Sequence, residues 1–579
     1  MTEESNVGAE RPGKKVIEPY PLAGGKLRLS QVITTFGPGA ILDLPRESIM
    51  VAGLDNWPDN WSPEQSIRDV RLESSLGLEK FYSPAPASPR VYPGGLPCVR
   101  FPRDLICSNC GLFSRRNTCG NCSAKTYPAR LIVICPAGHA SDFPWSWWAH
   151  SGSRCTGQPR LRLISQGKTA ALADLAVRCE TCKKPPRSLG GALGPAALSG
   201  RECSGERPWL IGSQPERCHE KPRSVLRGAS NVYFSSTLSA LSIPPWSDPI
   251  QILLNEQWQT LGQLSLKLLP EAIESLKEFS GVNPNDVILA IQQRKSNTTT
   301  TGNLRREEYL ALRNPGSSNF YHPLADFQIR AEPVPALFQT QIAQVVLASR
   351  LREVTVLRGF TRIDPPDPEN VEQKLAPIAQ KQPNWLPAVE HRGEGIFLEL
   401  VESRVRDWER RPAVQQRMER LNAAYVVWRE QRNLSAAPPV QPRTVLLHTL
   451  AHLLIRQLSL ECGYSSTSLR ERIYSGADTC GLLIYTASAD ADGSLGGLVQ
   501  QGTRQRFDST LQALLEHAQW CSADPLCTEH DPTKTGKLNG ASCHVCSLVA
   551  ETSCERGNRF LDRAFITDLP GVAASIGYF

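Results

Sequence analysis

The spacing of cysteines between residues 107 and 218 constrains this chain more than any other feature. This stretch holds ten of the eighteen cysteines in the sequence. It opens with two Cys-x-x-Cys pairs, Cys107 with Cys110 and Cys119 with Cys122, separated by eight residues. In each pair the two-residue gap lets both sulfurs face one ion. The spacing therefore predicts a four-thiolate, zinc-ribbon-like site. Zinc suits such ligands best, although spacing alone leaves an iron–sulfur cluster open.

The compartment decides whether these thiols bind metal or form disulfides. The first residues lack the basic-then-apolar layout of a signal peptide, and the longest apolar runs are too short to cross a bilayer. We therefore expect a cytoplasmic protein with reduced, metal-binding thiols and no membrane partner. The net charge of +7 is compatible with a nucleic-acid partner but is not specific for one.

Two further metal sites are expected in the same stretch. One set combines a close cysteine pair with two distant single ligands. The other combines Cys and His on a tight turn with a second His and Cys nearby, and here a histidine hydrogen-bonded within an aromatic cluster is an equal alternative. The first set is Cys179, Cys182, Cys203 and Cys218, and the second is Cys135, His139, His150 and Cys155.

The C-terminal region predicts a fourth site, anchored by the close pair Cys543 and Cys546. Five cysteines compete for four positions there, and we prefer Cys527 and Cys554 as the remaining ligands, with Cys521 as a spare. Three cysteines without sequence partners are expected to be buried thiols. These are Cys98, Cys462 and Cys480.

Apolar periodicity predicts several elements in the second half of the chain. A helix begins at Pro412 and carries an apolar stripe, with arginines on its other faces. Residues 444–462 form a buried helix that Gly463 is placed to cap, and residues 342–349 read as a further helix. Basic side chains on and near the first helix, and on residues 350–362, are candidate contacts to DNA phosphates. They are Arg350, Arg352, Arg358, Arg362, Arg417 and Arg420.

Catalytic signatures are incomplete. Residues 166–169 end like a phosphate-binding loop, but the first glycine of that motif is replaced by Arg162. His448 and His452 have zincin spacing, yet Thr449 stands where the catalytic glutamate belongs. An enzyme remains the alternative, as a metal-dependent nuclease or hydrolase using His448, His452 and Asp490 or Asp492. A pure protein scaffold is the third possibility.

Several blocks of the sequence resemble one family. They are RLSQVITTFGPGAILD near the N-terminus, CPAGHASDFPWSWWAH, RGASNVYF, LHTLAHLLI, GGLVQQG and NGASCHVCSLVAETSCERGNRFLDR. Together they resemble DrmB, a core subunit of the bacterial DISARM anti-phage defence system, from about residue 25 onward. The last portion is also similar to the MrfA-type zinc-binding domain, in which one cysteine precedes a Cys-x-x-Cys pair and another follows it. Cys527, Cys543, Cys546 and Cys554 match that order best, with a wider first spacing.

This resemblance implies a non-catalytic accessory subunit that pairs with a DrmA-like helicase, engages DNA and helps restrict phage DNA. We expect a multidomain α/β protein (mixed α+β) with zinc-ribbon-like modules in its N-terminal half. The expected divisions are a disordered tail at 1–25, an N-terminal segment at 26–105, a cysteine-rich region at 106–235, a mixed middle region at 236–395, and an MrfA-type zinc-binding domain at 396–579.

Overall fold

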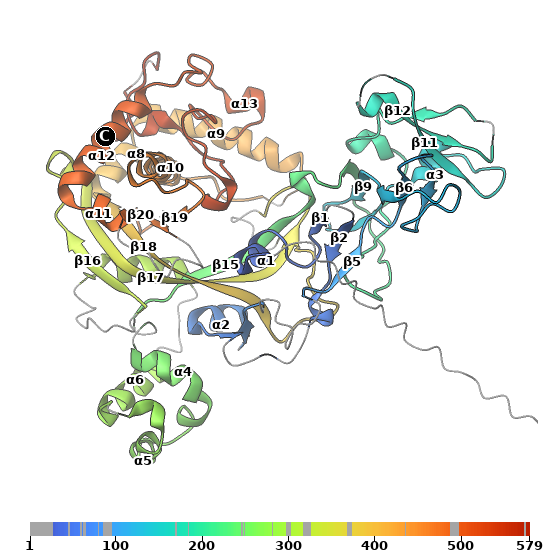
Figure 1. The fold of residues 1–579 in the computed structure, drawn as a ribbon. Coiled ribbons are helices and arrows are strands. Elements are labelled where there is room, and N and C mark those ends of the chain that lie inside the picture. Colours follow the sequence, from blue (N-terminus) through green and yellow to red (C-terminus); the bar gives the residue numbers. More distant parts are fainter. Residues whose placement is uncertain are drawn as a thin grey trace, which may run out of the picture.

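The protein is a mixed helix and sheet structure, described here from a computed structural model (Figure 1). The described residues are 27–579 apart from 45–46, 58–60, 62–64, 79, 85–94, 168, 170, 183, 245–246, 248, 281, 297–302, 316–325, 367–372, 433, 435, 487–496 and 573–574. The expected tail at 1–25 lies outside these residues, as do Asp490 and Asp492.

A long β-hairpin forms the centre of the largest sheet. Strand β17 (Ile342–Thr361) pairs antiparallel with β18 (Leu386–Leu400). The sheet order is β15-β17-β18-β20-β19, with β15 at Phe234–Leu241, β19 at Leu469–Tyr474 and β20 at Gly481–Thr486. Strand β16 (Gln328–Glu332) pairs with β17, and β4 (Phe81–Tyr82) joins β18 and β3 (Ser66–Ile67). The division expected at residue 395 falls inside β18, in the middle of this sheet.

Residues 342–349, expected to be a helix, begin strand β17 instead. Both faces of the strand are covered here. Val345 and Leu347 pack into the core under the C-terminal helices, whereas Val346 and Ala348 pack into a second core on the opposite face. A strand buried on both sides has no apolar–polar alternation, which explains the wrong prediction.

The two ends of the hairpin serve different cores. Ile342, Leu347 and Ile396 lie in the C-terminal core, whereas Val356 and Phe360 lie in the core of the N-terminal half. Because one pair of strands contributes to both cores, the two halves of the molecule are joined by continuous backbone hydrogen bonding. On the opposite face of the sheet, α7 (Leu304–Arg313) contributes Tyr309 and Leu312.

The C-terminal part surrounds one buried helix, α10 (Pro442–Cys462). Figure 1 shows it end-on, encircled by other helices. It is buried nearly all round, and Gly463 ends it in a left-handed conformation, as the sequence predicted. The predicted helix from Pro412 is also confirmed. The surrounding helices are α8 (Glu402–Glu409), α9 (Pro412–Glu430), α11 (Gly497–Gln501) and α12 (Arg504–Gln519), and α13 (Pro532–Thr535) packs against α9.

The cysteine-rich region consists of small three-stranded sheets around the helix α3 (Trp145–Ala149). Short sheets bury little apolar surface, so modules of this size need metal or other cross-links. The first sheet comprises β6 (Leu105–Cys107), β7 (Phe113–Ser114) and β8 (Thr126–Pro128); the second comprises β9 (Leu131–Ile134), β10 (Ala140–Asp142) and β14 (Arg223–Leu226); the third comprises β11 (Leu161–Ser165), β12 (Leu175–Cys179) and β13 (Arg187–Ser188).

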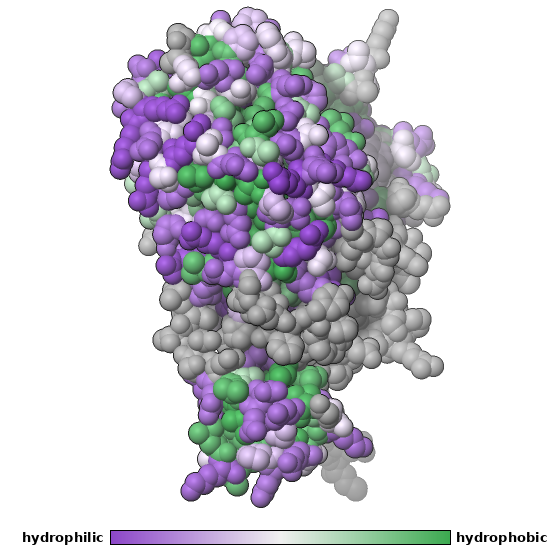
Figure 2. Space-filling model, turned by 90° about the vertical axis from the view of Figure 1, so that its left-hand side faces the viewer, coloured by the Kyte–Doolittle hydropathy of each residue, from purple (hydrophilic) through white to green (hydrophobic). Residues whose placement is uncertain are grey.

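The remaining elements flank the central sheet. The N-terminal ones are α1 (Leu29–Thr34), β1 (Ile41–Asp43), β2 (Ser48–Val51), α2 (Val70–Leu76) and β5 (Cys98–Arg100). A small helical unit, α4 (Pro249–Leu261), α5 (Leu269–Glu274) and α6 (Pro284–Ser296), has its own apolar core. Figure 2 shows this unit as a separate lobe at the bottom of the view. Among the described residues, no helix combines the length and apolar character that crossing a bilayer requires.

Candidate metal centres

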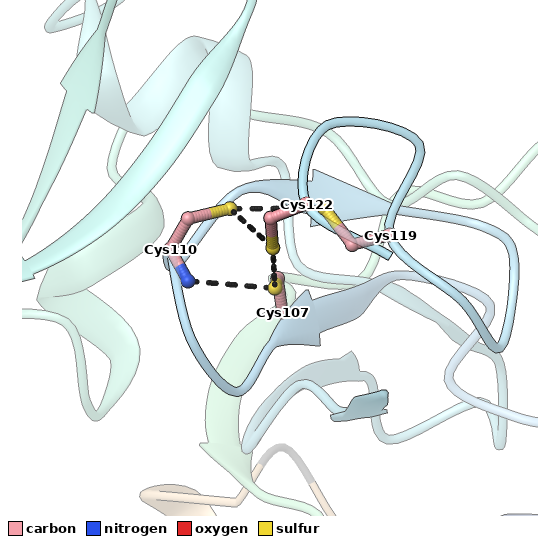
Figure 3. A group of neighbouring side chains, drawn as sticks. All are labelled: Cys107, Cys110, Cys119 and Cys122. Carbon is pink, nitrogen blue, oxygen red and sulfur yellow. Dashed lines mark hydrogen bonds between the residues drawn. The ribbon is translucent and has the colours of Figure 1, made fainter. Parts of the chain in front are cut away.

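The first Cys-x-x-Cys pairs converge on one point (Figure 3). Cys107 ends β6, and its sulfur lies 3.4 Å from that of Cys122. The sulfur of Cys110 lies 3.7 Å from that of Cys119 and 3.6 Å from that of Cys122. These separations are far longer than a disulfide bond of about 2.0 Å. The four thiols predicted from the sequence therefore form one group.

The distances fit a tetrahedral ion. Four Zn–S bonds of about 2.3 Å place the sulfurs roughly 3.8 Å apart, close to the observed separations. The backbone N–H of Asn121 donates to the Cys119 sulfur and that of Cys110 to the Cys107 sulfur, which stabilises thiolates. Gly111 has a φ of +68°, and a side chain there would meet the carbonyl oxygen of Leu163. Glycine therefore lets this turn approach the backbone of β11 closely.

The next eight candidate ligands also form two groups of four, but with exchanged members. Cys135 and His139 lie with Cys203 and Cys218, and not with His150 and Cys155 as expected. His150 and Cys155 lie with Cys179 and Cys182. The sulfurs of Cys135 and Cys218 are 4.0 Å apart, and those of Cys155 and Cys179 are 3.8 Å apart.

Strand pairing causes this exchange. Strand β14 pairs with β9, so the segment before β14, which contains Cys203 and Cys218, lies beside the turn after β9. Strand β12 pairs with β11 and places Cys179 opposite Leu161, close to the segment that holds Cys155. The order of ligands in the sequence contains no information about these pairings.

Hydrogen bonds fix which nitrogen of each histidine faces its group. His139 presents Nδ1 to the sulfurs of Cys135 and Cys203, while its Nε2 lies 2.8 Å from a carboxylate oxygen of Glu216. His150 donates from Nδ1 to the carbonyl of Ser146 and presents Nε2 to the sulfur of Cys182. A carboxylate or carbonyl behind a ligating histidine is the usual way to orient it.

The C-terminal group contains Cys521 and lacks Cys554, which corrects the preferred ligand set. Cys521 and Cys543 have sulfurs 3.5 Å apart, and those of Cys527 and Cys546 are 3.7 Å apart. Cys554 lies elsewhere, 3.2 Å from Nε2 of His448. The resemblance to the MrfA-type pattern had favoured Cys554 because it follows the Cys-x-x-Cys pair in sequence.

A buried arginine supports this group. The guanidinium of Arg563 lies 3.5 Å from the sulfur of Cys527 and forms an ion pair with Asp524 at 3.1 Å. It also donates to the carbonyl of Ala518. A cation beside four thiolates offsets part of the negative charge that remains when they bind a divalent ion.

The cysteines without partners in sequence also lie outside these groups in the structure. Burial raises the pKa of Cys98 to about 12. Burial, together with the nearby Glu461, raises the pKa of Cys462 to about 11, and Cys480 is fully buried. Cys480 is therefore buried as expected, whereas Cys98 and Cys462 are only partly buried.

Sequence reasoning missed one further cluster. His448 and His452 were noted for their spacing, but their neighbour Glu471, on β19, carried no signal in the sequence. Together with Cys554 these residues form a fifth group of potential metal donors. Burial lowers the pKa of His448, against the opposing effect of Glu471, which favours a neutral imidazole.

The candidate phosphate-binding arginines divide into two sets. Arg362 is 1% exposed, so the expectation that it meets phosphate is corrected: all three of its guanidinium nitrogens donate to backbone carbonyls. Arg352 pairs with Glu390 at 2.8 Å, and Arg417 pairs with Asp562. Arg358 and Arg420 are exposed, and Arg350 is half-buried.

Comparisons with known proteins match two parts of the chain to family models. Residues 28–234 match a family described as a domain of unknown function, DUF8724, and residues 450–547 match the MrfA Zn-binding domain. The donor groups and this domain match together support zinc as the cofactor. A crystal structure of the DUF1998 helicase MrfA bound to DNA aligns with a TM-score of 0.19 and 11% identity, over 38% of this chain and 23% of that one.

A relative of similar length extends the likeness to nearly the whole sequence. The DISARM protein DrmB of Bacillus paralicheniformis is 34% identical over 565 residues, which cover 91% of this chain and 97% of the relative. The chain therefore belongs to the DrmB family of DISARM proteins.

Proposed function

We propose that this protein is a non-catalytic, zinc-binding subunit that associates with a DrmA-like DNA helicase and helps it engage phage DNA. One observation carries the proposal, namely the relationship to DrmB over 91% of the chain. Metal ions in this role hold the shape of docking surfaces and do no chemistry.

The composition of the metal groups supports a structural role. Each group at residues 107–122, 135–218, 150–182 and 521–546 supplies four protein donors. A tetrahedral ion with four protein ligands has no position left for water or substrate, whereas catalytic zinc keeps one open. The larger of the two described cavities, about 100 Å³, is lined chiefly by apolar side chains such as Leu131, Trp145 and Leu163.

Exposed arginines supply the proposed DNA contacts. Arg420 is exposed on α9, and Arg410 and Arg411 are exposed at the junction of α8 and α9. Arg358 is exposed on β17, and Arg350 on the same strand is half-buried. Contacts of this type bind the phosphate backbone, so binding would be salt-sensitive and largely independent of sequence.

The proposal is tested by purifying the chain alone and with its helicase partner. We expect a stable complex that binds single-stranded and forked DNA more tightly than the helicase alone, by fluorescence anisotropy at several salt concentrations. Arg420→Gln and Arg358→Gln should weaken DNA binding and reduce the salt dependence by about one ion per arginine. Arg154→Gln, an exposed arginine in the cysteine-rich region, is the matched control.

Two results would overturn this function. Cleavage of DNA by the isolated chain with Mg²⁺ or Mn²⁺, lost in His448→Gln, would indicate a nuclease. Tight association with the helicase without any change in DNA affinity, even at low salt, would indicate a scaffold that contacts only protein.

A further inference from the structure

Four buried donors meet at the centre of the C-terminal part. His448 and His452 lie one turn apart on α10, Glu471 lies on β19, and Cys554 follows a short helical turn at Glu551–Ser553. Nε2 of His448 is 3.1 Å from Oε1 of Glu471 and 3.2 Å from the Cys554 sulfur. The ligand atoms of all four residues lie within 4.8 Å of one another.

The hydrogen-bond geometry of His452 shows that this cluster is not satisfied by hydrogen bonds alone. Nδ1 of His452 lies 2.9 Å from the carbonyl oxygen of Ser547, which can only accept, so Nδ1 carries the hydrogen. In the neutral ring Nε2 then carries a lone pair and no hydrogen. This nitrogen lies 3.5 Å from Oε2 of Glu471. Neither of these two buried atoms has a hydrogen-bond partner among the described residues. Two facing acceptors in a buried site are unfavourable unless a cation lies between them.

A direct ion pair between a protonated His452 and Glu471 fits the distance less well than two ligands on one metal ion. A charge-assisted N–H···O bond is about 2.7–2.9 Å long, much shorter than the 3.5 Å between His452 and Glu471. Two ligands on one ion with bonds of about 2.0–2.1 Å lie roughly 3.3–3.4 Å apart. The observed distance of 3.5 Å between His452 and Glu471 is closer to the distance between two ligands that share one ion.

The turn at Cys554 resembles those of the other groups. The backbone N–H of Arg556, two residues later, donates to the Cys554 sulfur at 3.3 Å, and that of Asn558 at 3.2 Å. The same donation from two residues later occurs at Cys119, Cys203 and Cys521. Each of those cysteines belongs to a four-donor group. Cys554 therefore has the backbone environment of a ligating thiolate.

We propose that His448, His452, Glu471 and Cys554 form a fifth, structural zinc site. The ion would join α10, β19 and the segment after residue 553, and it would have four protein ligands with no open position. The carboxylate is already held by the N–H of Glu555 at 2.9 Å, as metal-binding carboxylates usually are. The match to the MrfA Zn-binding domain covers residues 450–547 and so includes neither His448 nor Cys554.

Zinc content of the full chain tests this site. After removal of loosely bound metal, we expect mass spectrometry to find five zinc ions per chain, and four in Cys554→Ala. Cys480→Ala is the matched control, because Cys480 is a buried cysteine of the same core outside every donor group, and it should keep five. Four ions in the wild type and an unchanged count in Cys554→Ala would overturn the proposal.

A second measurement on the unaltered protein covers the case in which the variant does not fold. The other four groups contain fourteen cysteines and two histidines, whereas the fifth adds one sulfur and three lighter donors. X-ray absorption at the zinc edge should therefore find about three sulfurs per zinc. A value near 3.5 sulfurs per zinc, with four ions bound, would show that the cluster holds no zinc.

Discussion

Replacing Arg362 with alanine tests whether this arginine stabilises the fold or binds DNA. The side chain is buried at the end of β17, and its nitrogens donate to the carbonyl oxygens of Gly138, Val232 and Gly39 at 2.8, 2.5 and 2.9 Å. It also lies over the ring of Phe360. The chain segments that it joins are widely separated in sequence.

The expected cost follows from those contacts. Each hydrogen bond from a charged group contributes about 1.5–3 kcal/mol net, and three of them suggest roughly 5–9 kcal/mol. Burial works in the opposite direction, since it lowers the pKa of Arg362 to about 10, a penalty of about 3 kcal/mol for the charged form. The difference, about 2–6 kcal/mol, is a large part of the stability of a typical domain.

Denaturant unfolding followed by tryptophan fluorescence measures this loss, and DNA anisotropy at a temperature where the variant is folded measures binding. We expect Arg362→Ala to lower the unfolding midpoint strongly and to leave DNA affinity unchanged. Arg420→Ala, on the exposed face of α9, should shift stability by about 0.5 kcal/mol or less. An unchanged unfolding midpoint in Arg362→Ala, together with a several-fold loss of DNA affinity, would refute the structural role.

Three further outcomes are expected. Cys110→Ser should release one zinc ion and expose the first cysteine module to proteolysis, whereas Ser108→Ala in the same turn should do neither, as measured by a colorimetric zinc assay and limited trypsin digestion. Asp562→Asn should destabilise the C-terminal core by about 3–5 kcal/mol, because it leaves the largely buried Arg417 without its carboxylate, and calorimetry would detect this. Burial raises the pKa of Glu353, but Arg470 and Arg472 outweigh it and lower that pKa to about 2. The ionised Glu353 carboxylate therefore contributes about 3 kcal/mol to stability. This contribution is complete above the pKa of glutamate in the unfolded chain, near 4.3, and is lost as the pH falls towards 2. The urea midpoint should therefore fall more steeply below pH 4.5 in the wild type than in Glu353→Gln, and parallel curves would contradict it.

The sequence predicts local features of this protein well. The candidate ligands at residues 107–122 lie within one small three-stranded sheet of consecutive strands, so their spacing in the sequence brings them together. Helix α10 was predicted because its apolar residues run all round and Gly463 follows it. In each case the deciding interactions connect residues that are near in sequence.

Features that depend on strand order could not be predicted. Cys135 meets Cys218 only because β14 pairs with β9, and nothing in the spacing favours that pairing over another. Likewise Glu471 is an ordinary carboxylate in the sequence, and only the pairing of β19 with β20 aims it at the histidines of α10. The sequence therefore indicates which residue types can bind metal, whereas the fold determines which of these residues meet at one site.

The position of Arg362 links the metal groups to the central sheet. Its Nε donates to the carbonyl of Gly138, the residue before the metal donor His139. Gly138 has a φ of +88°, and a side chain there would overlap Ala376, so this turn tolerates little displacement. The same strand begins at Ile342 in the C-terminal core, which contains α10 and its two histidines. A continuous strand, with a turn that carries one donor group at one end and the core that contains the fifth donor group at the other, can transmit a displacement between them. Loss of zinc from residues 135–218 should therefore loosen the end of β17 near Arg362 before it affects the C-terminal core. Hydrogen exchange of β17 amides on chelation would resolve this order, and simultaneous loss of protection along the whole strand would argue against it.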